Sequence, residues 1–241
     1  MKVMDASELY DPEFRKLIKE KKPTIIIPVG SLEQHGAHLP ITTDSDIVTE
    51  IASRLAKKCG FIVFPTVSYG ISFEHEPLSS ISISDVNYRS FLRDILSDLL
   101  TMKVSINSVI ILNGHHGNLE ALNKLPKTLK IKFGPRIGKP PRCYSYWHFM
   151  KHEFDHAGFV ETSLMLAISD KVKMKKAKKG LITKGLSEKE IQRINKLSTN
   201  PGGFPKVAKN GVWGDPTGAT KKDGEKFLAE IVRNLAKKWQ S

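Results

Sequence analysis

Two short runs of apolar, mostly β-branched residues constrain the fold most strongly. Thr24–Val29 (TIIIPV) and Ser108–Leu112 (SVIIL) lack the polar alternation of a half-exposed strand. Such continuous runs are typical of strands that are buried on both faces of a sheet. Longer amphipathic segments separate these runs along the chain. Because parallel strands need long crossover connections, the alternation predicts an α/β fold.

The rest of the chain continues the same alternation. Further strands are predicted at Phe61–Pro65 and Arg142–Tyr146. Thr199–Pro205 and the stretch around Asp215 are typical of loops. With no internal repeat and no interdomain linker, we predict a single three-layer αβα domain over residues 1–241, with a mainly parallel central sheet. The predicted helices are Asp46–Lys58, Tyr88–Met102, Leu119–Lys130, Glu161–Ile168 and Lys222–Lys238.

Cysteine usage and the apolar runs indicate the compartment. Cys59 and Cys143 are the only cysteines, too few for a disulfide framework, which favours a reducing environment. The first residues lack the apolar core of a signal peptide, and no apolar run has the roughly 20 residues that span a bilayer. We therefore expect a cytoplasmic protein without membrane association.

The net charge of +13 favours an anionic partner, and six lysines gather between Lys171 and Lys179. No recognisable nucleic-acid-binding module accompanies them, so a solvated lysine-rich face is the preferred interpretation. A small-molecule substrate that carries a phosphate fits the charge as well. A basic nucleic-acid-binding protein with purely structural histidines is the alternative from another class.

Each buried run leads directly into a polar loop that contains glycine. GSLEQHGAHLP follows Thr24–Val29, and NGHHGN follows Ser108–Leu112. Open parallel sheets bind ligands at the carboxyl ends of their strands. We therefore expect the two loops to meet at one functional site.

The residues of these loops suit a metal site. Glu33, His35 and Asp44 supply the carboxylate and imidazole groups that hold Zn, Mn or Fe(II). In an extended segment, residues two apart project to one side, so Glu33 and His35 can face one pocket. His115 and His116 are adjacent and point in different directions, so one of them is expected to bind metal. Taken singly, each residue has a structural explanation, such as helix capping by Asp44. Their clustering after buried strands favours the metal site.

Four segments of the chain together resemble a known family. GSLEQHGAHLPITTD, NGHHGN, DHAGFVETS and GVWGDPTGAT, which lie between about Pro28 and Thr220, are similar to successive signatures of the creatininase family of metal-dependent amidohydrolases. The resemblance implies a layered α/β domain with two divalent metal ions per chain, either Zn, Fe(II) or Mn. It also implies a homo-oligomer, for which we expect a hexamer.

Matching positions assign roles to particular residues. The resemblance implies that Asp44 bridges the two ions and that His156 transfers the proton, first as general base and then as general acid. A histidine with a pKa near neutrality suits that task. The implied metal ligands are Glu33 and His115 on one ion, His35 and Glu161 on the other, and Asp44 on both.

The substrate is less constrained, because the chain departs from creatininase itself. Creatininase has a metal-binding glutamate two residues after the matching histidine, where this chain has Gly117, and its tryptophan-bearing flap is not matched here. These departures favour the archaeal formamidopyrimidine ribonucleotide deformylase branch, which acts in flavin and deazaflavin (F420) biosynthesis. Creatinine amidohydrolysis and trimming of a modified peptide are the alternatives. Candidates for substrate contact are His38, His116, Trp147 and Asp215.

Overall fold

The computed structural model describes residues 4–101, 106–133 and 140–240. Within these ranges, five strands form one sheet in the order β1-β3-β2-β4-β5, and all four pairings between them are parallel. The central strands β2 and β4 pair along their whole length, from Thr24 opposite Ser108 to Val29 opposite Asn113. The strands are β1 (Met4–Asp5), β2 (Thr24–Val29), β3 (Ile62–Val63), β4 (Ser108–Asn113) and β5 (Arg142–Ser145).

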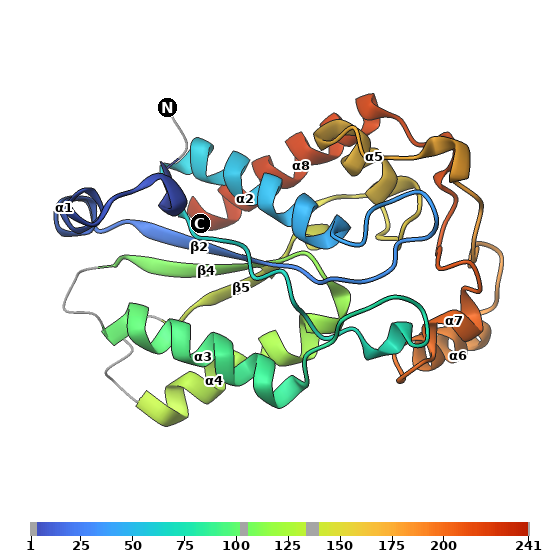
Figure 1. Cartoon of the computed structure of the whole chain (residues 1–241), viewed down its shortest axis with the longest axis horizontal. Helices are drawn as coiled ribbons and strands as arrows, with labels where there is room; N and C mark the ends of the chain where they lie inside the picture. Colours follow the sequence, from blue (N-terminus) through green and yellow to red (C-terminus); the bar gives the residue numbers. More distant parts are fainter. Residues whose placement is uncertain (1–3, 102–105, 134–139, 241) are drawn as a thin grey trace.

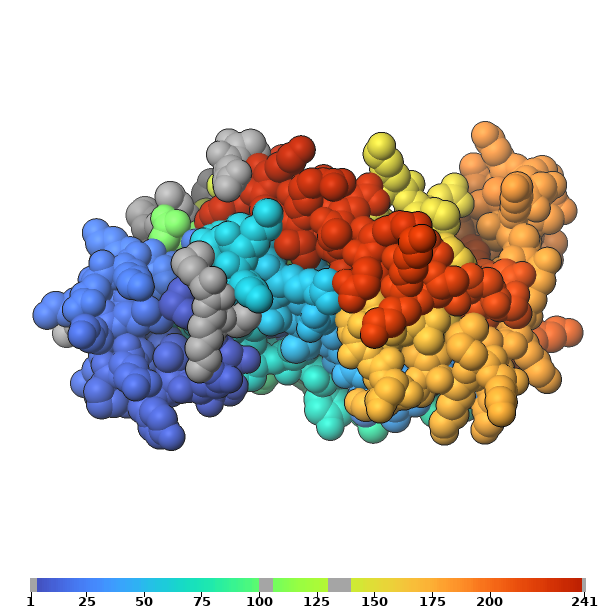
Figure 2. Space-filling model, turned by 90° about the horizontal axis from the view of Figure 1, so that it is seen from above, coloured from blue at the N-terminus to red at the C-terminus, as the bar shows by residue number. Residues whose placement is uncertain are grey.

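Helices cover both faces of the sheet. α2 (Thr43–Cys59), α5 (Phe159–Ile168) and α8 (Lys221–Gln240) lie on one face, while α3 (Asp85–Thr101) and α4 (Leu119–Phe133) lie on the other (Figure 1). The first group also forms much of the surface in Figure 2. The predicted three-layer αβα arrangement with a parallel sheet is therefore confirmed. None of the described helices is long and apolar enough to cross a membrane.

The two faces of the sheet pack into separate apolar clusters, and consecutive residues of β4 belong to different ones. Ile110 packs into the cluster with α2, α5 and α8, whereas Ile111 packs into the cluster with α3 and α4. Their exposed fractions are 1% and 0%, so neither face of the strand reaches solvent. Burial on both faces explains why the sequence of this strand shows no polar alternation.

Several predicted boundaries need correction. The helix predicted at Asp46–Lys58 begins at Thr43, so Asp44 lies inside its first turn rather than before it. The helix predicted at Tyr88–Met102 begins at Asp85, and Met102 lies outside the described residues. The strand predicted at Phe61–Pro65 pairs only at Ile62–Val63. Acidic residues favour the first turn of a helix, which explains both early starts.

Three α-helices of the described residues were not predicted, although each carries a recognisable signal. α1 (Asp11–Lys21) has Pro12 in its first turn, and α6 (Glu188–Ser198) begins with a capping box between Ser187 and Glu190. α7 (Phe204–Val207) begins inside the stretch predicted as a loop at Thr199–Pro205. Proline is tolerated at the start of a helix, because the first N–H groups have no partner there. α6 and α7 lie beyond the carboxyl ends of the strands (Figure 1).

The two-sided core can be tested on neighbouring residues of β4. We expect Ile110→Ala and Ile111→Ala each to lower the free energy of unfolding by about 2–5 kcal/mol, because each leaves a cavity in a packed core. Urea denaturation followed by circular dichroism measures both effects. Lys127→Ala, on the exposed side of α4, should change the free energy by less than about 0.5 kcal/mol. A nearly neutral effect of one isoleucine substitution would contradict coverage on both faces.

Candidate active site

Five predicted site residues converge at the carboxyl ends of the strands, although they come from four separate segments. The loop after β2 supplies two of them, the first turn of α2 one, the loop after β4 one and the first turn of α5 one. None has an exposed fraction above 3%. So many ionisable groups are rarely buried together unless they are paired or bind a metal. The five residues are Glu33, His35, Asp44, His115 and Glu161.

Local hydrogen bonds fix the loop after β4. The side chain of Asn113, the last residue of the strand, accepts from the N–H of His115 at 3.1 Å and donates to its carbonyl at 2.8 Å. Gly114 lies between them, where a Cβ would come within 2.6 Å of the Asp44 carbonyl oxygen and 2.8 Å of Val48 Cβ. Only glycine therefore lets this loop approach the start of α2, which brings His115 to Asp44.

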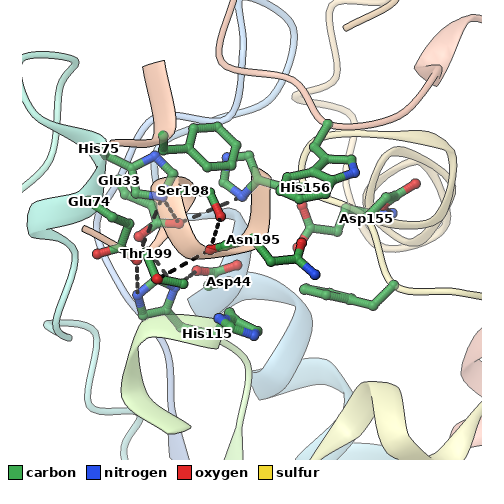
Figure 3. A pocket seen from close by; sticks show the side chains of 15 residues that line it. Glu33, Asp44, Glu74, His75, His115, Asp155, His156, Asn195, Ser198 and Thr199 are labelled. Atoms are coloured by element: carbon green, nitrogen blue, oxygen red, sulfur yellow. Dashed lines mark hydrogen bonds and ion pairs between the residues drawn. The ribbon is translucent and has the colours of Figure 1, made fainter. Parts of the chain in front are cut away.

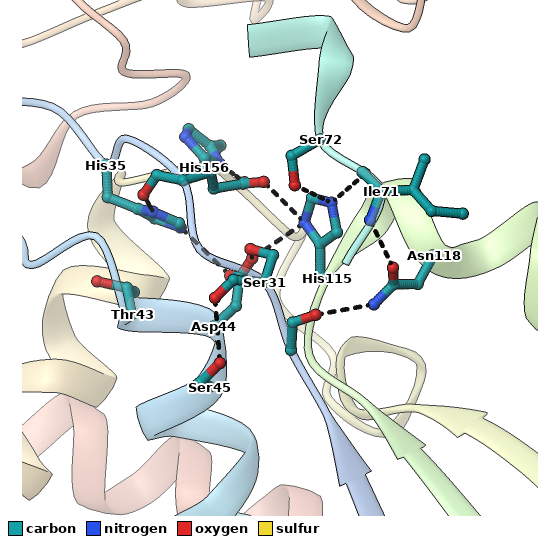
Figure 4. A network of polar contacts seen from close by, with 12 residues as sticks. Ser31, His35, Thr43, Asp44, Ser45, Ile71, Ser72, His115, Asn118 and His156 are labelled. Carbon is teal, nitrogen blue, oxygen red and sulfur yellow. Dashed lines mark hydrogen bonds and ion pairs between the residues drawn. The ribbon is translucent and has the colours of Figure 1, made fainter. Parts of the chain in front are cut away.

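Asp44 lies at the centre of the group (Figure 4). Its Oδ1 is 3.2 Å from His35 Nε2, and its Oδ2 is 3.0 Å from His115 Nδ1. Oδ2 also accepts a hydrogen bond of 2.6 Å from the Ser31 hydroxyl, which fixes the carboxylate in place. One carboxylate thus faces both histidines, as expected for a bridging ligand.

The ligand atoms form two groups that share Asp44. Glu33, Asp44 and His115 make one, and His35, Asp44 and Glu161 make the other, with all atoms of a group within 4.8 Å of one another. The histidine–carboxylate pairs inside the groups are 3.0 to 3.5 Å apart. Two ligands on one tetrahedral ion, each at about 2.1 Å, lie roughly 3.4 Å apart. The spacing therefore suits a cation in each group.

Both histidines are oriented by the ring nitrogen that faces away from the carboxylates. Nε2 of His115 donates to the carbonyl of Ile71 at 2.7 Å, so Nδ1 carries the lone pair toward Glu33 and Asp44 whenever the ring is neutral. Nδ1 of His35 donates to the backbone carbonyl of Glu33 at 3.1 Å, so its Nε2 is the free nitrogen. Metal-binding histidines are held by this kind of outer hydrogen bond.

Two buried carboxylate oxygens support the same interpretation. Glu33 Oε2 and Glu161 Oε1 have no hydrogen-bond partner among the described residues. Buried polar atoms nearly always have a hydrogen-bond partner, so these two unpaired oxygens indicate that a ligand such as a metal ion binds them. Glu33 Oε2 lies 3.3 Å from His115 Nδ1 without hydrogen-bond geometry, as two ligands aimed at one point would. A mixed set of carboxylates and imidazoles fits Zn, Mn or Fe(II).

The buried carboxylates of the site need positive charge beside them, and in the absence of metal His35 and His115 can supply it. Burial alone would lower the pKa of His35, but Asp44 and Glu161 raise it to about 10. Burial likewise opposes the charge of His115, yet Glu33 and Asp44 raise its pKa well above its usual range. Without metal, the carboxylates therefore favour the protonated form of both rings. Divalent cations would replace these protons, because only deprotonated imidazole binds a metal.

His156 lies beside this ligand cluster. Its Nε2 is 3.0 Å from the carbonyl of Gln34 and 3.1 Å from the side-chain nitrogen of the same residue, so Gln34 holds one edge of the ring. Nδ1 on the other edge is 3.8 Å from Glu33 Oε1. Burial, and then the charges of His35 and His75, lower the pKa of His156 well below its usual range, which keeps the ring neutral. A neutral ring here can accept a proton.

Glu74 and His75 also belong to the site, although they were not predicted. Nε2 of His75 is 3.2 Å from Glu33 Oε1, and its Nδ1 is 3.0 Å from the side-chain nitrogen of Gln34. The oxygen of that amide accepts from the N–H of Gly36, so its nitrogen donates to His75, and Nε2–H of His75 then donates to Glu33. The two residues follow no predicted strand, and their adjacency was the only signal in the sequence.

A cavity of about 350 Å³ opens onto the ligand cluster (Figure 3). Three aromatic residues, Phe154, Phe204 and Trp213, line part of it. None of the described residues that line this cavity is a lysine or an arginine. α6 contributes a polar wall of Asn195 and Ser198, which continues to Thr199 directly after the helix.

Of the four predicted substrate-contacting residues, only His116 lines this cavity. His38 is buried, and its Nε2 lies 2.9 Å from the hydroxyl of Thr162. Trp147 stacks on the ring of Phe154 at 4.6 Å between centroids. Asp215 accepts from the N–H of Thr217 at 3.0 Å and caps a short 3₁₀ turn.

Comparison with known proteins agrees with this geometry. The family model described as "Creatininase: Creatinine amidohydrolase" matches residues 7–239. A mycofactocin precursor peptide peptidase of Mycolicibacterium smegmatis is 34% identical, over 90% of this chain and 86% of the peptidase. A 2-amino-5-formylamino-6-ribosylaminopyrimidin-4(3H)-one 5'-monophosphate deformylase of Methanocaldococcus infernus is 30% identical, over 68% of this chain and 69% of the deformylase.

Solved structures show the same fold. A crystal structure of creatinine amidohydrolase superposes with a TM-score of 0.79 at 22% identity, covering 98% of this chain and 96% of the other. Two others that match are described as "Zn-Zn type" and "Creatininase Mn". The matched family model spans almost the whole chain and includes every residue of the ligand cluster. This chain therefore belongs to the creatininase family.

Proposed function

We propose that this chain is an amidohydrolase that cleaves an amide C–N bond at a centre of two divalent metal ions. The observation that carries the proposal is the pair of ligand groups that share Asp44. Glu33 and His115 would complete one site, and His35 and Glu161 the other. Two such ions would polarise the amide carbonyl and lower the pKa of water for attack near neutral pH.

The residues around the centre are suited to proton transfer. His156 would accept a proton from the attacking water and return it to the leaving nitrogen, since its Nδ1 faces the cluster and Gln34 holds its other edge. Phe204 packs against this ring at 4.8 Å and, with Trp213, covers the cavity with apolar surface. Exclusion of bulk water strengthens the electrostatic interactions inside such a cavity.

A peptide amide is the first substrate class to test. The similarity to the peptidase extends over more of the chain, and at higher identity, than the similarity to the deformylase. The cavity beside the cluster also has no described lysine or arginine that could bind a phosphate. Both observations favour a peptide over the phosphorylated formamide that the sequence suggested.

Deformylation of a formamidopyrimidine ribonucleotide remains the second candidate. The net charge of +13 favours an anionic substrate, and the deformylase is a relative of substantial coverage. Creatinine is the third amide to include, because the family model and the solved structures carry its name. The homo-oligomeric state and the cytoplasmic location stay predictions.

Metal content tests the shared ligand. Protein reconstituted with Zn, Mn or Fe(II) and then desalted should hold about two ions per chain, measured by elemental mass spectrometry. Asp44→Asn should lose both ions, because its carboxylate belongs to both groups. Asp46→Asn is the matched control, since that carboxylate lies in the same helix and binds the Thr42 hydroxyl. One ion retained at full occupancy by Asp44→Asn would show that the sites do not share it.

The role of His156 is tested by turnover. His156→Ala should lower kcat by about 10²–10⁴-fold while the metal content stays unchanged, because the proton-transfer group is lost but no ligand is. His152→Ala, an exposed histidine of the same segment, should keep the activity of the unmodified enzyme. Near-full turnover of His156→Ala with both ions bound would contradict the assignment.

The substrate class is tested with three amides side by side. The metal-loaded protein is incubated with a mycofactocin precursor peptide, a formamidopyrimidine ribonucleotide monophosphate and creatinine, and peptide fragments, formate and creatine are measured. We expect cleavage of the peptide, and expect it to be lost in Asp44→Asn. Formate release alone would move the assignment to the deformylase. No hydrolysis of any of the three by protein that holds both ions would overturn these substrate assignments.

A further inference from the structure

The carboxylate of Glu74 lines the cavity, and apart from its own backbone N–H it has no close hydrogen-bond donor among the described residues. Its Oε1 is 3.8 Å from His115 Nε2 and 4.0 Å from His75 Nε2. Both N–H groups already have nearer acceptors, the carbonyl of Ile71 at 2.7 Å and Glu33 Oε1 at 3.2 Å. Glu74 is therefore available to a donor that enters the cavity.

Glu74 also lies where two cavities meet. A second cavity, of about 550 Å³, shares Glu74, His116 and Thr199 with the cavity beside the ligand cluster. Figure 3 shows Glu74 on the side of His75 and Glu33, with Asp155 across the cavity. A substrate longer than a single amide group can therefore extend past Glu74 into the second cavity.

Gly117 keeps this passage open. A Cβ at that position would lie 2.5 Å from His115 Nε2 and 2.8 Å from Glu74 Oε1, and would also collide with the carbonyl oxygen of Ile71. Any larger residue at position 117 would thus displace the Glu74 carboxylate or the imidazole. The space beside His115 is occupied instead by Glu74, which comes from a distant loop.

The other carboxylates of the cavity are already in use. Three of them belong to the proposed ligand groups, and Asp155 accepts from the N–H groups of Val160 and Glu161 at the start of α5. In the second cavity, Lys124 is paired with Glu120 four residues away, so it does not neutralise Glu74. The groups beside Glu74 are the imidazoles of His115 and His75, whose N–H groups donate to other acceptors, so a positive group in the ligand could pair with this carboxylate directly.

We propose that Glu74 binds a cationic group of the substrate, such as an ammonium or a guanidinium, a few bonds from the amide that is cleaved. This inference rests on the proposed function, because it takes the scissile carbonyl to lie at the metal centre. It narrows the substrate to amides that carry an amine or a basic side chain. Several N–H donors on one cation can satisfy both oxygens of the carboxylate.

Matched metal-binding probes test this proposal. β-Alanine hydroxamate and butyrohydroxamate have the same length and bind metals through the same two oxygens, but only the first ends in an ammonium. Isothermal titration of the metal-loaded protein should give at least about 10-fold tighter binding for β-alanine hydroxamate, as expected for one charge-assisted hydrogen bond. Glu74→Gln should abolish this preference while retaining both metal ions and the affinity for butyrohydroxamate.

Glu76→Gln is the control, because it removes the same charge from an exposed position of the same loop. It should keep the preference for the ammonium. Equal affinity of the two probes for the unmodified protein, or a preference that survives Glu74→Gln, would overturn the role of Glu74 and leave the metal centre intact. Failure of both probes to bind protein that holds its ions would overturn the proposed reaction site and this inference together.

Discussion

The site depends on burying three carboxylates together, which is possible only if positive charge lies among them. Asp44 makes this arrangement work, because its two oxygens face His35 and His115 on opposite sides. Without those partners, each buried carboxylate would cost several kcal/mol. The hydrogen bond from Ser31 fixes Asp44, and the first turn of α2 places it near the favourable end of the helix dipole. The remaining features of the site are arranged around this carboxylate.

The parallel sheet explains how the groups meet. β2 and β4 are adjacent and end at the same level, so the loops that follow them lie side by side. α2 and α5 begin at the same edge and contribute carboxylates from their first turns. α6 and α7 lie outside this edge and complete the cavity. The sheet thus positions the ligand cluster, and the later segments line the cavity beside it.

The sequence predicts the sheet and the residues directly after its strands better than it predicts the segments that line the cavity. Residues buried on both faces of β4 leave a continuous apolar run, and Glu33, His35 and His115 stand directly after such runs, so both features are visible without a structure. Glu161 and His156 became candidates only through the family resemblance. Glu74 and His75 were missed, because their loop reaches the site through tertiary contacts that leave no periodic pattern. For the same reason the resemblance did not reveal that His38 packs against Thr162 instead of lining the cavity.

The residues of the ligand cluster are spread along the sequence from Glu33 to Glu161. This spacing links metal binding to folding. Neither group comes from a single segment, so both form only when distant parts of the chain have packed together, and ions would bind tightly only to the folded state. Ions that bind only this state add to its stability by mass action. Metal supply would therefore set how long the protein survives proteolysis, as well as how fast it works.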